Sequence, residues 1–210
     1  MEIRTKILEA AARVYSQHGF RGATTRLIAQ EADVNEVTLF RTFGSKEALI
    51  EEALRTCAEH ADFARLPAEP DDPERELAAW FAAHRAHIRQ ARPLIISCMA
   101  ELETRPEVAC SAARAPHRAW AELSRYLGRL KEMGLMDADV HLNAAGSMFM
   151  GAAFGDAMGR EMIPEMFPQP HETAAHEYTR VFLRAIAPRE SATKTRNGRT
   201  AASRNTSSDN

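Results

Sequence analysis

The sequence has few of the features that mark several large classes of protein. It contains only three cysteines, Cys57, Cys98 and Cys110, and this odd number at wide spacing indicates neither a disulfide framework nor a cysteine-based metal site. We interpret them as reduced, buried thiols and expect the chain to be cytoplasmic. The N-terminal segment MEIRTKILEAAARVYSQHG is interrupted by polar residues throughout, so it does not have the pattern of a signal peptide.

Long hydrophobic runs and a strong charge imbalance are also missing. The most apolar stretch, residues 142–158, contains Asn143, Ser147 and Asp156 and falls short of the about 20 apolar residues that span a bilayer. The formal net charge of -2 excludes a uniformly basic nucleic-acid-binding protein but allows a local cationic patch. Hydrophobic residues make up 45% of the 210 residues, which is enough to build a packed core.

Apolar residues recur at helical spacing along nearly the whole chain, and no strand pattern or internal repeat appears, so we expect an all-α fold. Asn35 and Ser45 are expected to cap helices, and Gly44 to end one. Four helices are predicted in the first third of the chain: residues 3–19, a short helix from Thr24 or Thr25 to Ala32, Glu36–Phe43, and Lys46 to about Phe63.

The remainder of the chain continues the helical pattern until its last residues. Asp72 as a cap followed by Pro73 predicts a helix through Ile88, and Pro93 and Pro106 punctuate the region after it. Two long helices are expected at roughly 137–162 and 171–187. Residues 188–210 contain no periodic apolar residue, so we predict a disordered basic tail, either simply solvated or acting as a DNA-contacting arm.

The segment TTRLIAQEADVNEVTLFRTFGSKEAL carries the functional signal. Two short helices joined by a turn at Asp33-Val34-Asn35 form a predicted helix-turn-helix, in which small Ala29 lets the helices approach closely. The second helix has the diameter to enter a major groove. We therefore expect residues 1–46 to form a DNA-binding domain and residues 47–187 a helical body for ligand binding and dimerisation.

Residues 5–54 resemble the DNA-binding head of the TetR family of bacterial regulators. The resemblance rests on the lead helix ILEAAARVYSQHGF, on GATT, on IAQEADV, on TLFRTF and on GSKEAL, in this order and spacing. It implies a transcriptional regulator, by family default a repressor, that binds a palindromic operator as a dimer and is released by a small-molecule effector. Beyond the head, the chain resembles the family only in length and helical character.

Four positions depart from the family pattern. Asp33 stands where the family usually has Gly, and we expect positive φ there, which Asp tolerates at some cost. Val37 replaces Gly, Ala or Pro, Phe40 replaces Tyr, and Thr42 replaces His. If the Tyr hydroxyl normally bonds a phosphate, Phe40 cannot do so, and the operator sequence does not follow from relatives.

The side chains around the turn suit contacts with a duplex. Lys46, just after the Ser45 cap, suits a phosphate, and Arg41 suits a phosphate or a guanine edge. A merely solvated side chain is the alternative for each position. The expected DNA-contacting residues are Thr25, Arg26, Asn35, Glu36, Val37, Thr38, Phe40, Arg41, Thr42 and Lys46.

Three glycines in the body indicate a close helix contact. Gly151, Gly155 and Gly159 are four residues apart and share one helix face. Because one short recognition helix reads few base pairs, a homodimer reading two half-sites about 34–36 Å apart is expected, with these glycines at its interface. The alternative is a helix packed closely inside its own chain.

The middle helices are expected to hold the effector. Candidate pocket residues are Trp80, Phe81, His84, Cys98, Met99, Glu103, Trp120, Met148 and Phe149, although aromatic and Met side chains at helical spacing also fit plain core. For His84 and Glu103 two interpretations stay open: a polar pair inside an apolar pocket, or two separate surface residues.

An enzyme is not indicated. The sequence has no phosphate loop, nucleophile elbow or HExxH motif, and its histidines are scattered, so neither a cofactor nor a metal is expected. Two alternatives to a DNA-binding regulator are a helical enzyme or metal-binding bundle, and a helical adaptor or small-molecule-binding bundle without a DNA function.

Overall fold

The computed structural model describes residues 2–59, 65–105 and 113–189, and within these ranges every regular element is helical. In chain order the elements are α1 (Ile3–Gly22), α2 (Thr25–Glu31), α3 (Glu36–Phe43), α4 (Lys46–Glu59), α5 (Pro73–Gln90), α6 (Arg92–Ala100), α8 (Arg114–Glu132), α9 (Leu142–Gly159), the 3-10 turn η1 (Pro164–Met166) and α10 (His171–Ile186). The all-α prediction is confirmed.

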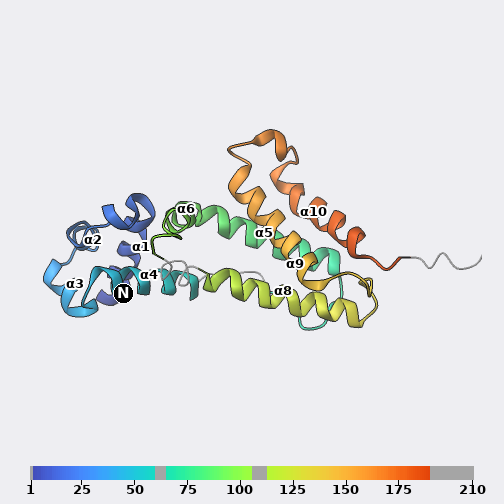
Figure 1. Ribbon diagram of the computed structural model, residues 1–210, viewed down its shortest axis with the longest axis horizontal. Helices are drawn as coiled ribbons and strands as arrows, with labels where there is room; N and C mark the ends of the chain where they lie inside the picture. The colour runs from blue at the N-terminus through green and yellow to red at the C-terminus, as the bar shows by residue number, and fades with distance from the viewer. Residues whose placement is uncertain (1, 60–64, 106–112, 190–210) are drawn as a thin grey trace, which may run out of the picture.

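The molecule is elongated, with a small head at one end and a larger body behind it (Figure 1). The head is α1–α4. In the body, α5 crosses beneath the α9–α10 hairpin, α8 runs along the opposite side, and α6 lies between α5 and the head. The recognition helix α3 is therefore at the far end of the molecule from α9 and α10.

Two hydrophobic cores correspond to this division. The head core gathers buried residues of α1–α4, and Leu49, Ile50, Ala53 and Leu54 of α4 belong to it together with Cys98 of α6. The body core gathers residues of α5, α8, α9 and α10. Because α4 fills the head core and then continues toward α8, the head passes into the body through an unbroken helix.

The helix boundaries follow the predicted local chemistry. The side chains of Thr24, Asn35 and Ser45 accept backbone N–H bonds from Leu27, Val37 and Ala48 at 3.2, 2.8 and 3.1 Å. Asp72 does the same for Arg75 at 3.1 Å. Each cap satisfies an N–H group that a helix start leaves without an intrahelical partner.

Two boundaries in the body differ from expectation. The helix predicted from about residue 137 begins only at Leu142, since the Asp137 carboxylate accepts the Asp139 backbone N–H at 2.8 Å and holds a turn there. The long helix α8 had not been delimited from the sequence. The predicted end of α4 near Phe63, and nearly all of the predicted tail, lie outside the described residues.

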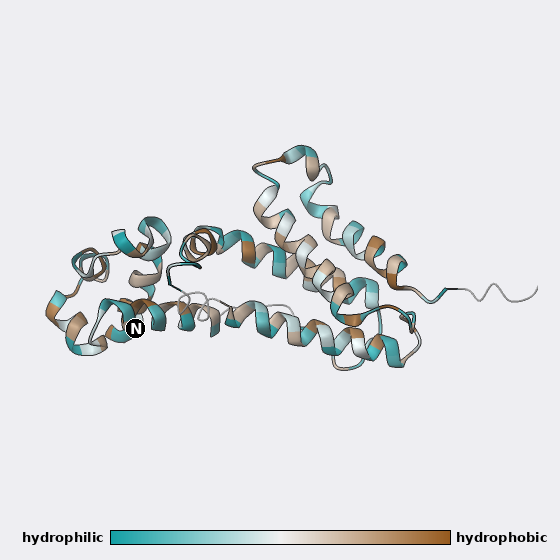
Figure 2. Cartoon of the chain, viewed as in Figure 1, coloured by the Kyte–Doolittle hydropathy of each residue, from teal (hydrophilic) through white to brown (hydrophobic). Residues whose placement is uncertain are grey.

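Membrane insertion finds no support in the described ranges, where none of the helices combines the length and the apolarity that crossing a bilayer requires. Figure 2 shows that the strongly hydrophobic helix α6 faces the junction between head and body rather than forming a separate span.

Candidate nucleic-acid interface and apolar cavity

The turn between α2 and α3 has the geometry of a helix-turn-helix. Asp33 adopts φ 52°, the only positive φ of a non-glycine residue in the described chain. The Val34 N–H donates to the Ala29 carbonyl at 3.0 Å, and Ala29 is buried, so the two helices meet at a small side chain. The positive φ expected at Asp33 is thus confirmed.

Helix α3 presents one face to solvent and one to the head core. Leu39 and Phe43 are buried, whereas Val37 is 71% exposed, Phe40 is 46% exposed and Arg41 is exposed. The outward residues lie three or four positions apart and form one stripe. An apolar pair flanked by a guanidinium is a surface that can contact thymine methyl groups, bases and phosphates.

Several predicted contact residues bond to one another. The Thr25 hydroxyl donates to the Glu36 carboxylate at 2.5 Å, which joins the starts of α2 and α3. The Thr42 hydroxyl donates to the Thr38 carbonyl one turn earlier at 2.7 Å. Asn35 uses its side-chain oxygen as the α3 cap. Their DNA contacts remain predictions, and the second carboxylate oxygen of Glu36 is the one that the Thr25 bond leaves for a cytosine.

Lys46, which is predicted to contact a DNA phosphate, also binds a residue of the head itself. Its ammonium donates to the Phe20 carbonyl at 2.9 Å and lies 3.9 Å from the centre of the Phe20 ring. An ammonium has three donors, so two remain after this bond. By contrast, Arg26 and Arg41 are exposed and form no ion pair with any other described residue.

A large apolar cavity of about 500 Å³ lies between the head and the body. It is walled by α4, α5, α6, the start of α8, and α9. Its described lining is Leu54, Cys57, Ala58, His84, His87, Ile88, Ala91, Leu94, Ile95, Cys98, Met99, Leu102, Ala113, Ala115, Pro116, Met150, Gly151 and Phe154. Its size is within the range that accommodates a drug-sized ligand.

The head of this chain matches the family model described as "Bacterial regulatory proteins, tetR family" over residues 7–53. The head therefore carries a DNA-binding domain of the TetR type. Curated relatives agree over the same segment. The uncharacterised regulator YvkB of Bacillus subtilis is 43% identical over 49 residues, and the repressor KstR2 of Rhodococcus jostii is 38% identical over 52 residues.

These alignments cover 23% and 25% of this chain and only about a quarter (26%) of either relative. The fold matches more widely. The regulator FadR of Bacillus subtilis, solved with stearoyl-CoA, superposes with a TM-score of 0.64 over 87% of this chain and 98% of FadR, at 15% identity. The family model that matches the head describes regulatory proteins.

In the helical body, only part of the predicted pocket set lines the cavity. His84, Cys98 and Met99 do so. Trp80, Phe81 and Phe149 instead form a buried aromatic stack, with Phe149 4.4 Å from the Phe182 ring. These three residues are core because their rings pack on one another and leave no space for a ligand.

The remaining pocket candidates lie away from the cavity. Trp120 packs over Gly146, where an added Cβ would be 2.8 Å from the indole. Met148 is 57% exposed on α9, and Glu103 is exposed. The suggested His84–Glu103 pair therefore does not form: His84 is buried and its ring stacks on Trp80 at 4.9 Å.

The three glycines of α9 have different surroundings. An added Cβ at Gly151 or Gly155 would meet nothing within 4 Å, whereas at Gly159 it would be 2.7 Å from the Phe167 ring. Gly159 thus serves packing within the chain. Gly151 and Gly155 continue a stripe with Ala144 and Met148 at helical spacing on the outer face of α9.

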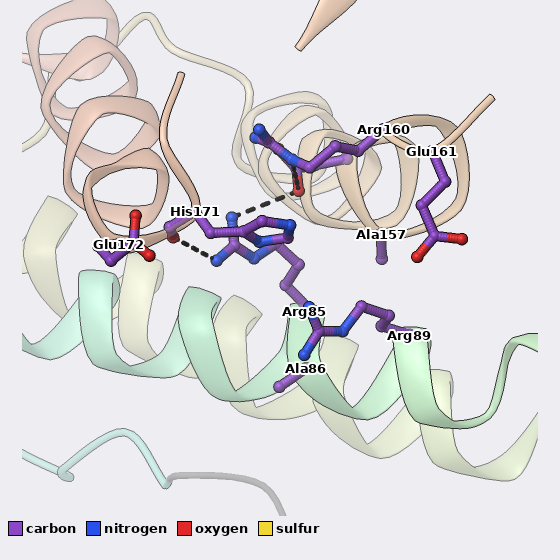
Figure 3. A pocket seen from close by; sticks show the side chains of 9 residues that line it. Arg85, Ala86, Arg89, Ala157, Arg160, Glu161, His171 and Glu172 are labelled. Carbon is purple, nitrogen blue, oxygen red and sulfur yellow. Dashed lines mark hydrogen bonds and ion pairs between the residues drawn. The ribbon is translucent and has the colours of Figure 1, made fainter. Parts of the chain in front are cut away.

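A smaller cavity of about 230 Å³ lies between α5, the end of α9 and the start of α10 (Figure 3). The Asp156 carboxylate, 1% exposed, accepts from Arg85 at 3.3 Å and from Arg160. Arg85 also donates to the His171 carbonyl at 2.7 Å. One carboxylate thus pairs with two guanidiniums, and together with the bond from Arg85 to His171 the cluster ties three helices together.

The residues that join the cavity wall to the head carry no recognisable sequence pattern. Glu101, just after α6, accepts the Phe20 backbone N–H at 2.8 Å and the Tyr15 hydroxyl at 3.2 Å. The Arg105 guanidinium carbon lies 3.2 Å from the centre of the Phe20 ring, so Phe20 contacts a cation from this segment as well as Lys46. The aromatic Phe20 after the Gly19 break was the available signal, but the partner was not predictable from spacing.

Proposed function

We propose that the chain is a transcriptional repressor that binds a palindromic operator as a homodimer and releases it when a small molecule occupies the apolar cavity. It would act in the cytoplasm, where its DNA target is found. The observation that carries this proposal is the α3 stripe of Val37, Phe40 and Arg41, exposed on a helix with a firmly capped N-terminus. The repressor KstR2 shares the same head, which supports repression.

A dimer is supported by the outer face of α9. The stripe of Ala144, Met148, Gly151 and Gly155 is apolar, and an added Cβ at either glycine would meet nothing within 4 Å, although Gly151 also borders the apolar cavity. On α10, the apolar side chain of Val181 is 69% exposed. Two copies meeting through such faces would set the two recognition helices at a fixed separation, as a two-part operator requires.

Release of DNA requires that the cavity and the head be coupled, and Phe20 supports such a coupling. Two cavity walls reach it: α6 through Glu101, which holds the Phe20 N–H, and α4 through Lys46, which holds the Phe20 carbonyl. A ligand that displaces either helix would move the end of α1. The ligand would then favour a head arrangement that no longer fits both half-sites, and DNA would oppose the ligand equally.

The first experiment is selection of host genomic fragments bound by the purified chain, followed by titration of the selected duplex at several salt concentrations. We expect Lys46→Ala to weaken binding to all sequences and to lower the salt slope by about 1. Arg75→Ala, on an exposed residue of α5, is the matched control and should change nothing.

Since Lys46 also holds Phe20, the melting temperature of each variant is measured alongside. If the chain selects no fragment and binds random DNA without salt dependence, the repressor proposal fails and a protein-binding adaptor becomes the better account. Unchanged binding by Lys46→Ala would remove its phosphate role but leave the α3 contact in place.

A further inference from the structure

The chemistry of the apolar cavity restricts what can bind in it, and this inference rests on the proposed function. Among the described residues of the lining there is no Asp, Glu, Lys or Arg. Transferring an ionised group into such surroundings costs several kcal/mol unless a counter-charge or hydrogen bonds compensate. The nearby charge cluster of Asp156, Arg85 and Arg160 belongs to the other, smaller cavity.

Among the described lining residues, the polar side chains are two imidazoles and two thiols. Burial lowers the pKa of His84 to about 4, with a further contribution from His87. Burial also lowers the pKa of His87, with the charge of Arg118 second. Both imidazoles are therefore neutral at pH 7, and a neutral imidazole has one nitrogen that donates and one that accepts.

The thiols do not supply a charge either. Burial raises the pKa of Cys98 to about 11 and raises that of Cys57 as well. Arg118, the cation near His87, donates to the carbonyls of Ala58 and Glu59 at 2.6 and 3.1 Å. Its guanidinium is thus already engaged on the α4 backbone.

We propose that the effector is an uncharged, largely apolar molecule with one hydroxyl or carbonyl group that hydrogen-bonds to the imidazoles of His84 and His87. The two residues are three positions apart on α5 and face the same cavity as Ile88 and Ala91. One end of the ligand would meet this polar face, and the apolar walls from α4, α6 and α9 would enclose the rest.

The test compares three probes with the same alkyl chain: decanol, decanoate and decylammonium. Each is titrated against the full chain at about pH 7.5, with displacement of the neutral dye Nile red as the readout. We expect decanol to displace the dye, and the two ions to bind at least about a hundredfold more weakly, because the described part of the lining offers neither ion a counter-charge. Equal affinity of either ion, or failure of decanol to bind, would overturn the proposal.

Two variants locate the binding site. Ala58→Phe fills the cavity from α4 and should abolish decanol binding, whereas Ala100→Phe, on an exposed residue of α6, should not. His84→Phe keeps a ring against Trp80 but removes both nitrogens, and should weaken decanol about tenfold, the value of one hydrogen bond. The exposed His117→Phe is its control. An unchanged affinity in both cavity variants would place the probe elsewhere and refute the site.

Because dye displacement uses no DNA, this test is separate from the proposed function. If decanol binds as expected but leaves operator affinity unchanged, the ligand class stands and the release mechanism fails. If decanol does not bind while the operator is still recognised, the regulator stands and the ligand class fails. Should Ala58→Phe not fold, the three-probe comparison on the unmodified chain decides alone.

Discussion

The backbone at Asp33 adopts a conformation that a β-carbon disfavours. Its φ of 52° is held by the turn between α2 and α3, and its carboxylate, 94% exposed, lies 3.5 Å from Lys6. Such an exposed ion pair contributes little to stability. We expect Asp33→Gly to leave stability unchanged or raise it by up to about 1 kcal/mol, since relief of strain outweighs the greater freedom of the unfolded chain.

Thermal melting of the two proteins checks this prediction. A clear fall in melting temperature for Asp33→Gly would mean that the Lys6 contact is worth more than the strain. The matched change Asp71→Gly, in an exposed loop where φ is not positive, should give no gain.

Acid sensitivity is expected from His84. Its folded pKa, about 4, is below the ordinary 6.5, so the unfolded chain takes up a proton in this window before the folded one does. The contribution of neutral His84 to the free energy of unfolding is present in full above pH 6.5 and is lost as the pH falls toward 4. We expect a loss of about 2 kcal/mol between about pH 7.5 and about pH 5.

Urea unfolding at both pH values measures this loss, and His84→Phe serves as the comparison. The variant should lose less stability on acidification, because no imidazole remains at this buried position. His87 is present in both proteins, so its contribution to the pH dependence of stability cancels in the comparison. An identical pH dependence would show that His84 accepts a proton in the folded state without penalty.

For individual residues, the features that depend only on a few sequence neighbours could be predicted from the sequence. The caps at Asn35, Ser45 and Asp72 and the positive φ at Asp33 each depend on local backbone chemistry, and all were confirmed. The bond from Lys46 to Phe20 was not predictable, because it joins residues 26 positions apart.

Among the elements, α6 is the one that touches both the cavity and the head. Cys98 and Met99 face the cavity, and Glu101, at the end of the same helix, holds Phe20 and Tyr15 of α1. Burial of Tyr15 raises its pKa, so its hydroxyl stays protonated and donates. A shift of α6 is therefore transmitted to α1 through one carboxylate.

We expect Glu101→Ala to reduce the coupling between the cavity and DNA. Coupling is measured as the ratio of operator affinities without and with saturating decanol, and it should fall severalfold in the variant. Glu103→Ala removes the same charge from an exposed residue two positions away and should keep the ratio. If Glu101→Ala binds the operator more weakly but keeps the same ratio of affinities without and with decanol, Glu101 stabilises the fold and does not couple the two sites.

Helix boundaries were predictable where a cap or a proline marks them and not elsewhere. Pro73 after Asp72 gave the start of α5, and residues 171–187 closely match α10. The start of α9 was placed too early because the Asp137 turn interrupts an otherwise helical pattern. Helix α8 begins without a side-chain cap, so nothing local marked its start.

For the whole molecule, the open space over Gly155 allows a test of the dimer. In a monomer, Gly155→Leu would meet nothing at its Cβ and should stabilise α9 by about 1 kcal/mol. In a dimer that packs through this face, the same side chain would separate the two copies. We therefore expect the Gly155→Leu variant to have a more stable monomer, at least tenfold weaker self-association and weaker operator binding.

Sedimentation over a range of concentrations and thermal melting report on the two effects separately. Gly159→Ala is the contrasting variant, because its Cβ would press on Phe167 of the same chain and lower stability without acting on the dimer directly. If Gly155→Leu associates as strongly as the unmodified chain, the interface lies elsewhere.

The cavity could be predicted only in outline. Helical spacing identified His84, Cys98 and Met99 but gave the same pattern for Trp80, Phe81 and Phe149, which are core. Whether an apolar side chain touches a neighbour or an empty space depends on how α4, α5, α6 and α9 pack together. The glycines of α9 illustrate the same point, because three equally spaced positions have different surroundings that the spacing does not predict.

The buried carboxylate of Asp156 has a consequence for how this body can change over evolutionary time. It pairs with Arg85 from α5 and with Arg160 at the end of α9, and each arginine side chain is only 12% exposed. Replacing Asp156 alone would leave two adjacent guanidiniums with little solvent, a far greater penalty than the loss of one ion pair. Among descendants of this sequence, the three positions should be kept or substituted as a set, so that covariation marks the joint between α5, α9 and α10.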